Sequence, residues 1–324
     1  MKTINTINRI AFATILTFIF STVTAQTDTM YIMKAGVVIN KQSIMPTDVD
    51  SIIFYKPTST SVNPFNLQMV TIPAGTFDMG SPTTEPWRST NESQFSVTLS
   101  AFKMSKYEIT NAEYAAFLNA KSIGSNGLYA AGAYPLDALI NQNIAWGLTY
   151  TVNKWVPVAG YENHPVISVT WYGAKEFATY VGGTLPTEAQ WEYASRGGTT
   201  TPFNTGNCIS NLQSNFNWAL PYYGSCTLTA TTSQSKTQAV GAYAANAYGL
   251  HDMHGNVWEW CADWFDTYPT TAQIDPTGPS IGSYRMARGG SWNYSPQYIR
   301  SAHRAYYDPR SRNPDLGFRV VLVP

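Results

Sequence analysis

Hydrophobic residues recur at helical spacing in three segments, near 110–118, 170–181 and 187–196. Each segment opens at a threonine that can cap a helix, and these are Thr110, Thr170 and Thr187. In the first and third segments a Glu or Gln follows three residues later, which is the capping-box pattern. Glycine pairs follow the second and third segments and end the pattern. The sequence therefore predicts three short helices.

Short β-type runs stand on both sides of these segments. Two runs within 30–40 surround Lys34–Gly36 and predict a hairpin, and residues 51–55 form a third run. Residues 56–64 are rich in Ser, Thr and Pro without periodicity, which is typical of a linker. We therefore expect a small β-rich module with its linker over 26–64 and a main domain over 65–324.

The main domain opens with two predicted strands over 69–80. Residues 199–324 then alternate short β-type runs with polar loops rich in Gly, Asn and Ser. A few helices within a loop-rich, strand-containing body is an α+β pattern. The strand–helix alternation of a doubly wound sheet is not present.

The N-terminus carries the pattern of a secretory signal. Lys2 and Arg9 precede an apolar run over 10–23, and small residues follow at Val23 and Ala25. The run is shorter than the ~20 residues of a membrane span, although an uncleaved anchor is the alternative interpretation. We expect a signal peptide over 1–25 and a secreted or periplasmic protein of the bacterial cell envelope. No integral membrane span is expected after cleavage.

Charge is sparse and balanced along the 324 residues. Lys and Arg number 20, Asp and Glu number 20, and charged residues make up 12% of the chain. No net basic field exists to attract phosphates, so nucleic acid is not an expected partner. The hydrophobic share of 44% predicts a packed globule. The aromatic share of 14% is unusually high, and these side chains can serve the core, a binding face or both.

Three cysteines are present. In an oxidising compartment, Cys208 and Cys226 are expected to form a disulfide, worth ~3 kcal/mol in the chain-entropy model. Cys261 lies among tryptophans and is expected to be a buried, inert thiol. The sequence has no CxxC motif, which argues against a zinc finger.

Six ordered motifs carry a resemblance to a known family. They include Ile72–Gly80, Leu185–Ala194 and the loop Gly249–Trp260, together with 106–111, 288–292 and 316–319. In this order they resemble the sulfatase-modifying-factor family, whose best-known member is the formylglycine-generating enzyme. The resemblance covers about residues 67–323. It implies a formylglycine-generating-enzyme-like (C-type-lectin-like) α+β fold with little regular secondary structure.

The resemblance also implies what this chain lacks. The enzyme of that family binds copper(I) through two cysteines that follow its Gly-Gly-Ser motif, and copper(I) prefers thiolate ligands. Here Tyr294 stands where the first cysteine would be, and residues 262–324 contain no cysteine. We therefore expect no copper and no formylglycine-generating oxidase activity by that mechanism.

The same resemblance implies a structural calcium ion in the 249–260 loop. Its ligands would be the side chains of Asp252 and Glu259 and the carbonyls of Gly255 and Val257. Oxygen ligands of this kind suit a hard cation. The alternative is that the two acids only accept backbone hydrogen bonds. A second calcium ion would use Asn215 and the carbonyl of Phe216, but its acidic ligand has no clear match.

Two further groups leave alternatives open. His251 and His254 could hold a transition metal, or they could be ordinary loop histidines. Four arginines near the C-terminus could form a groove with neighbouring tyrosines, or they could pair with Asp308 and Asp315 to hold the loops together. These arginines are Arg288, Arg300, Arg304 and Arg310, and the tyrosines are Tyr294, Tyr298, Tyr306 and Tyr307.

The sequence thus favours an exported, calcium-stabilised binding or structural module. Its contact surface would be an aromatic cleft near Ser291, Trp292 and Tyr294, for an unidentified peptide, protein or glycan. The alternative is a metal-dependent oxidase or protein-modifying enzyme that uses a different site around His251, His254 or His303.

Overall fold

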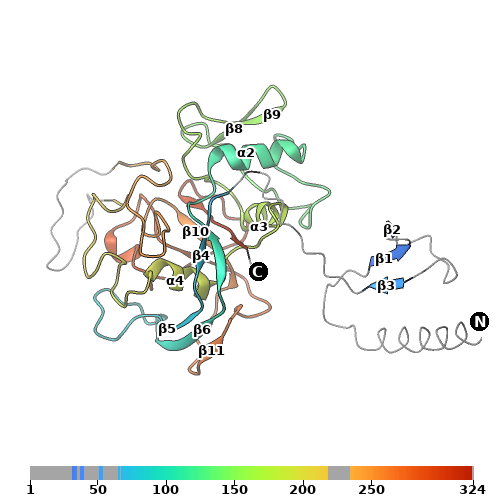
Figure 1. Cartoon of the computed structure of the whole chain (residues 1–324). Helices are drawn as coiled ribbons and strands as arrows, with labels where there is room; N and C mark the ends of the chain where they lie inside the picture. The colour runs from blue at the N-terminus through green and yellow to red at the C-terminus, as the bar shows by residue number, and fades with distance from the viewer. Residues whose placement is uncertain are drawn as a thin grey trace, which may run out of the picture. The chain divides into compact units, whose positions relative to one another are not determined.

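The computed structural model describes residues 31–34, 37–39, 51–53, 65, 67–217 and 234–322. The chain divides into two compact units, residues 1–60 and 61–324. In the first unit β1 (Tyr31–Lys34), β2 (Val37–Ile39) and β3 (Ser51–Ile53) form an antiparallel sheet in the order β2-β1-β3 (Figure 1). The expected hairpin and third strand are therefore present. The predicted signal peptide lies outside the described residues.

Three helices of the second unit form where the sequence predicts them. They are α2 (Asn111–Ala120), α3 (Trp171–Tyr180) and α4 (Glu188–Arg196), and each begins after its expected threonine cap. Both predicted capping boxes are made. Helix α4 ends at Gly197, whose left-handed φ of 56° favours glycine.

Short strands make up the rest of the regular structure. One sheet has the order β15-β7-β4 and another β11-β6-β5. Their strands are β4 (Met69–Ile72), β5 (Gly75–Met79), β6 (Phe95–Leu99), β7 (Phe102–Ser105), β11 (Gln273–Ile274) and β15 (Val321–Leu322). A hairpin of β8 (Leu148–Thr151) and β9 (Lys154–Pro157) lies beside α2 (Figure 1).

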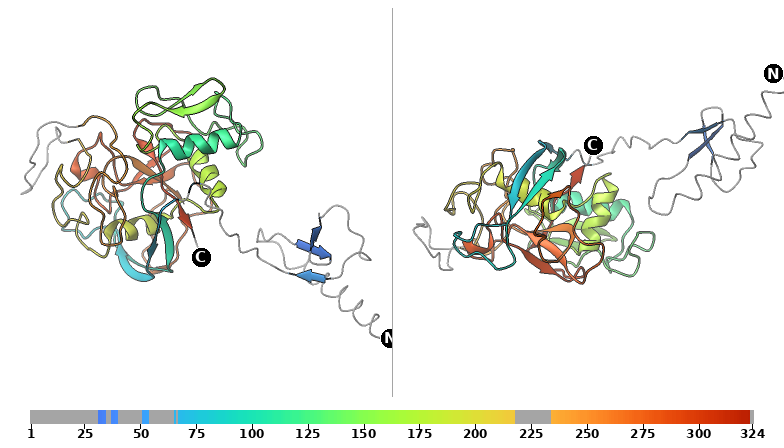
Figure 2. Two further views of the ribbon diagram at one scale, coloured as in Figure 1. Left: turned by 45° about the horizontal axis from the view of Figure 1, so that its top comes forward. Right: turned by 90° about the horizontal axis from the view of Figure 1, so that it is seen from below.

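A fourth sheet crosses the middle of this unit in the order β13-β12-β10-β14. Its strands are β10 (Trp258–Trp264), β12 (Arg285–Arg288), β13 (Ala305–Tyr307) and β14 (Leu316–Gly317). A 3₁₀ turn, η2 (Pro296–Tyr298), lies between β12 and β13. Long loops join these elements, as Figure 2 shows from two further directions.

The core is rich in aromatic side chains. In one cluster of buried residues, Phe117 of α2 and Phe177 of α3 pack with Trp258, Trp260 and other apolar residues. In a second cluster, Trp191 of α4 packs with residues of β4, β6 and β7. Core packing thus accounts for much of the aromatic excess. Within the described residues, no helix is long and apolar enough to span a membrane.

Candidate functional site

Tyr294 lies in the loop that follows β12, beside the central sheet. Its ring centroid is 5.3 Å from that of Trp258 and 5.5 Å from that of Tyr298, with both pairs edge to face. Trp292, two residues earlier, makes an edge contact with Trp146 at 6.0 Å. Ser291 is fully buried and its hydroxyl donates to Asp315 at 2.8 Å. Of the three predicted cleft residues, Ser291 therefore supports the loop from within.

A pocket of about 280 Å³ adjoins this aromatic group. Tyr298 and His303 contribute one side, and their ring centroids are 5.2 Å apart. The other lining residues come from a loop that precedes β6 and from η2, and they are Trp87, Arg88, Ser89 and Gln297. Aromatic faces, an amide, a hydroxyl and a guanidinium together can stack against a ligand and hydrogen-bond it. Sequence reasoning missed the 87–89 segment.

Trp87 is held in a strained backbone conformation. Its φ is 62°, which is rare for a bulky side chain. Its carbonyl accepts a hydrogen bond from Arg300 Nη2 at 2.9 Å. Arg300 also pairs with Glu85 at 2.6 Å and Glu92 at 2.8 Å, and all three side chains are buried. Strain that the surrounding structure maintains is a feature of binding and active sites.

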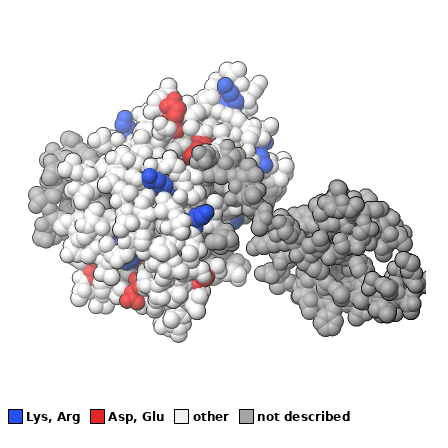
Figure 3. Space-filling view, in the orientation of Figure 1, with Lys and Arg blue, Asp and Glu red and all other residues white. Residues whose placement is uncertain are grey.

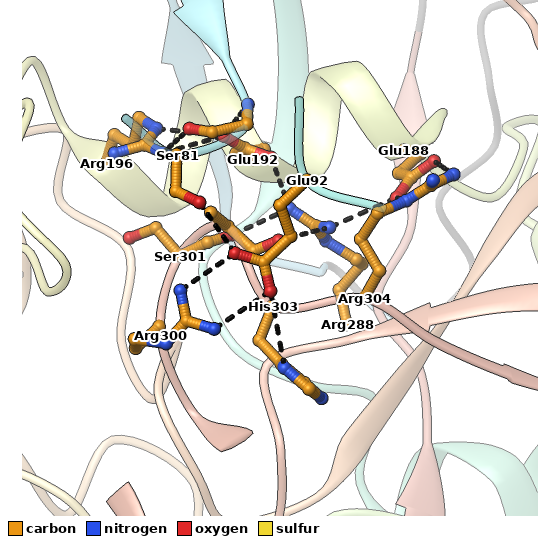
Figure 4. A network of polar contacts seen from close by, with 12 residues as sticks. Ser81, Glu92, Glu188, Glu192, Arg196, Arg288, Arg300, Ser301, His303 and Arg304 are labelled. Atoms are coloured by element: carbon orange, nitrogen blue, oxygen red, sulfur yellow. Dashed lines mark hydrogen bonds and ion pairs between the residues drawn. The ribbon is translucent and has the colours of Figure 1, made fainter. Parts of the chain in front are cut away.

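A network of buried ion pairs includes Arg300 and reaches His303, which is one of the residues that line the pocket (Figure 4). Arg288 forms ion pairs with Glu188, at 3.1 Å, and with Glu192. Glu192 also forms an ion pair with Arg196 at 2.8 Å. Arg304 pairs with Glu188 at 2.7 Å. With Arg300, Glu85 and Glu92, four arginines face four glutamates, so the formal charge of the network is zero.

The arginines therefore have the structural role, but the expected partners are wrong. Arg310 pairs with Asp137 at 2.6 Å, and the Asp308 carboxylate accepts from the Arg310 backbone amide at 2.8 Å. The Asp315 carboxylate accepts a hydrogen bond from the Ser291 hydroxyl. The actual partners of the three buried arginines lie on α4 and on the loop before β6, because these elements pack against the central sheet.

His303 connects the network to the pocket. Its Nδ1 is 3.7 Å from Glu92 Oε1. Burial lowers the pKa of His303. Burial alone would raise the pKa of Glu92, but the nearby His303 and the hydrogen bonds from Arg300 and Ser81 prevail and lower it to about 2. Glu92 is thus a permanent anion at neutral pH that orients both groups.

The other two candidate histidines are engaged by backbone. His251 Nδ1 is 2.7 Å from the carbonyl of Tyr243. His254 is buried, with Nδ1 2.7 Å from the Ile299 carbonyl and Nε2 accepting from the Asn204 amide at 3.0 Å. Burial lowers the pKa of His254 to about 4. Among the described residues, no group of three or more His, Cys, Asp or Glu is placed to hold a metal ion.

The 249–260 loop passes through left-handed conformations at Asp252, Gly255 and Asn256. A Cβ on Gly255 would lie 2.2 Å from the Asn215 carbonyl oxygen, so only glycine fits there. Asp252 Oδ2 accepts from the Gly241 amide at 2.6 Å, whereas its Oδ1 is buried and has no hydrogen-bond partner among the residues that the structure describes. An unpaired buried carboxylate oxygen suits a cation ligand.

Glu259, the second predicted acidic ligand, is more heavily engaged. Its Oε2 accepts from Trp191 Nε1 and from Arg319 Nε, each at 2.7 Å, and Oε1 accepts from Arg319 Nη2 at 2.8 Å. Oε1 thus accepts one side-chain hydrogen bond, and a carboxylate oxygen has two lone pairs. In this loop, Asp252 Oδ1 is thus the open carboxylate oxygen, and Glu259 Oε1 keeps one lone pair.

Glu108 joins this acidic group and was missed as a site residue. Its Oε1 accepts from Asn256 Nδ2 at 2.8 Å, and its Oε2 is buried and unpaired. Burial, and next the charge of Asp252, raises the pKa of Glu108 well above its usual range. Burial also raises the pKa of Asp252 to about 6. Three buried carboxyl groups near one guanidinium, that of Arg319, require neutralisation by protons or by a bound cation.

The remaining predicted residues have these positions. Asn215 and Phe216 are fully buried, and Asn215 donates to the Lys236 carbonyl at 2.9 Å while its Oδ1 has no partner. Cys261 is free and fully buried, and burial raises the pKa of its thiol. Cys226 lies outside the described residues, so the disulfide with Cys208 stays a prediction.

Comparison with known proteins identifies the family. The model of the sulfatase-modifying factor enzyme 1-like domain matches residues 56–323. The chain belongs to this family. It is 32% identical to the formylglycine-generating enzyme of Thermomonospora curvata, over 79% of this chain and 93% of that protein. It is 35% identical to the serine/threonine-protein kinase pkn1 of Chlamydia caviae, over 80% of this chain but 38% of the kinase.

Solved structures agree with this assignment. PvdO of Pseudomonas aeruginosa is 26% identical, covers 78% of this chain with 93% of its own, and has a TM-score of 0.59. Variable protein 1 of Treponema denticola has a TM-score of 0.58 at 23% identity, over 80% of this chain and 95% of that one, and so shows the fold alone. The formylglycine-generating-enzyme-like α+β fold expected from the motifs is confirmed, and Tyr294 occupies a surface of that fold.

Proposed function

We propose that this member of the sulfatase-modifying-factor family is an exported binding module rather than a copper oxidase. Its contact surface is the pocket of Trp87, Tyr298 and His303 together with the adjoining Tyr294 and Trp292. The ligand is a peptide, protein or glycan that stacks on these rings. A calcium ion held at Asp252 stabilises the loop behind this surface.

One observation carries the proposal. At the position where the resemblance places the first copper-binding cysteine, the chain has Tyr294, whose ring packs between Trp258 and Tyr298. A phenol cannot replace a thiolate as a copper(I) ligand. The free thiol of Cys261 is fully buried in the core. The residues at this surface therefore favour contact with a ligand over redox chemistry.

Charge supports a largely uncharged ligand. The chain has no net charge, and basic and acidic side chains are scattered on the face in Figure 3 without gathering in a patch. Among the residues that line the pocket, Arg88 carries the guanidinium, and burial favours neutral His303. Stacking on aromatic rings with a few directed hydrogen bonds suits a neutral peptide or glycan.

The experiment is a screen of the full chain on peptide and glycan arrays, followed by affinity measurement with Tyr298→Ala. Tyr306→Ala is the matched control, because both tyrosines are exposed and Tyr306 lies on β13 outside the pocket. We expect Tyr298→Ala to weaken binding about tenfold or more and Tyr306→Ala to change it less than about twofold. No ligand on either array, or equal losses for both variants, would refute the proposal.

A further inference from the structure

A second, larger cavity lies away from the aromatic pocket. Its volume is about 580 Å³, within the ~300–1,000 Å³ range of small-molecule sites. It lies between the start of α4 and the segment that carries β11, with one residue each from β5 and β6 in its wall. Figure 1 shows α4 beside β5, β6 and β11 in the lower part of the larger unit.

Apolar and polar side chains contribute about equally to the cavity wall. Met79, Phe95 and Ala189 form its inner side, and three prolines of the 269–279 segment together with Ile274 form its outer side. Tyr268 also lines it, with its hydroxyl donating to Glu188 at 3.1 Å. Such walls suit a ligand with an apolar body.

Asp263 supplies a carboxylate at this cavity. The residue is 5% exposed, and its Oδ2 accepts from the Glu188 amide at the first turn of α4, at 2.8 Å. Its Oδ1 has no hydrogen-bond partner among the described residues. Burial raises the pKa of Asp263 to about 7. Oδ1 is not among the buried unpaired atoms, so it is open to the cavity, where a ligand can donate a charge-assisted hydrogen bond to it.

Gly278 keeps the space above Asp263 open. A Cβ at this position would lie 2.9 Å from Asp263 Cβ and 3.0 Å from its Oδ1, and φ is +70°. The segment is fixed in place, because Asp275 accepts from the amide and hydroxyl of Ser100 at 2.8 and 2.7 Å. Its own amide donates to the Thr98 carbonyl at 2.9 Å. The cavity is therefore preformed.

The charges around the cavity favour a cation. Glu188 and Arg304 line it but neutralise each other at 2.7 Å. Asp266 and Asp275 also line it, and in the described part of the chain neither they nor Asp263 form an ion pair. Asp263 is buried and the other two aspartates are exposed. Carboxylates of one sign that line a cavity attract a positive ligand.

We propose that this cavity binds a small ligand that carries one ammonium group on an apolar body. The ammonium donates to Oδ1 of Asp263, and the apolar body fills the space between Phe95 and the proline-rich segment. The site is separate from the aromatic pocket and does not depend on its function. The ammonium can belong to a free amine or to the N-terminus of a peptide.

The test is calorimetric titration of the full chain at neutral pH with 2-phenylethylamine and with its neutral counterpart 2-phenylethanol. We expect the amine to bind at least about tenfold more tightly than the alcohol, because its hydrogen bond is charge-assisted. Phenylalanine amide and N-acetylphenylalanine amide form the second arm. If phenylalanine amide binds more tightly than 2-phenylethylamine, the ammonium group comes from a peptide N-terminus. Otherwise, it comes from a free amine.

Two variants and a control make the result specific. Asp263→Asn keeps the acceptor for the Glu188 amide and removes the charge, and Gly278→Ala fills the space above Oδ1. Both should weaken amine binding about tenfold or more, whereas Asp308→Asn, at an exposed aspartate outside the cavity, should leave it within about twofold. Circular dichroism confirms that each variant is folded. The proposal is overturned if the wild-type chain does not bind the amine at millimolar concentration, or if folded Asp263→Asn binds it as well as wild type.

Discussion

The guanidinium of Arg319 forms two hydrogen bonds with the carboxylate of Glu259, with Nε 2.7 Å from Oε2 and Nη2 2.8 Å from Oε1. Both side chains are fully buried. The other three N–H groups of Arg319 donate to the carbonyls of Ser105, Lys106 and His251. All five donors are used, so one side chain ties the end of β7, the 249–260 loop and β10 to the C-terminal segment.

Arg319→Ala should therefore be strongly destabilising. It leaves Glu259 buried without its charge partner, and breaking such a pair costs about 3–5 kcal/mol. Chemical denaturation followed by tryptophan fluorescence measures the loss in the free energy of unfolding. Arg312→Ala is the control, since this exposed arginine bonds only Asn141 and should change stability by less than about 0.5 kcal/mol. Equal effects of the two variants would contradict the role given to Arg319.

Calcium should raise the melting temperature of the full chain. A ligand present at about 100-fold above its Kd stabilises the folded state by about 2.7 kcal/mol. Asp252→Ala removes the open carboxylate and should abolish the difference between calcium and chelator. Asp78→Ala, at an exposed position on β5, should leave the difference intact. Identical melting curves of the wild-type chain in calcium and in chelator would rule out the site.

Acid should unfold the protein partly through Glu92. The folded-state pKa is lowered to about 2 from an ordinary 4.5, so Glu92 stabilises the fold above pH 4.5, and this contribution is lost as the pH falls toward 2. The full contribution is on the order of 3 kcal/mol. Glu92→Gln should be less stable at neutral pH and show a shallower loss between these values. A parallel pH profile for the variant and the wild type would count against this assignment.

Tyr294→Cys should not restore copper binding. Copper(I) in this family is held by a pair of thiolates, and residues 262–324 offer no second cysteine. The substitution also removes the ring that packs on Trp258, so some loss of stability is expected. Titration with copper(I) in competition with a chromophoric chelator provides the measurement. Stoichiometric, tight binding by the variant would show that the surrounding site supplies a second soft ligand.

Local signals predict the three helices correctly. Thr110 and Thr187 cap their helices because their partners Glu113 and Gln190 lie three residues away. The partners of buried arginines could not be predicted in this way, since Glu85 and Arg300 are 215 residues apart in sequence. Proximity in the sequence suggests Asp308 and Asp315 as partners of these arginines. In the folded chain, glutamates of α4 and of the loop before β6 are the partners.

The candidate sites show the same division. Asp252 and Glu259 are predicted as ligands because they stand in one continuous motif. Glu108 stands in another quoted motif, but only folding brings its carboxyl to Asp252. Trp87 gives no signal in the sequence, since its left-handed backbone and its place beside Tyr298 exist only in the folded chain, where its carbonyl accepts from Arg300.

The account's central claim is that this chain binds a ligand without copper or iron redox chemistry. The most direct measurement is the metal content of the full chain by mass spectrometry, after equilibration with calcium, copper(I) and iron(II) and removal of unbound metal. We predict about one calcium per chain at the Asp252 loop, with copper and iron each far below stoichiometric amounts. One copper or one iron per chain would contradict the account and favour an oxidase.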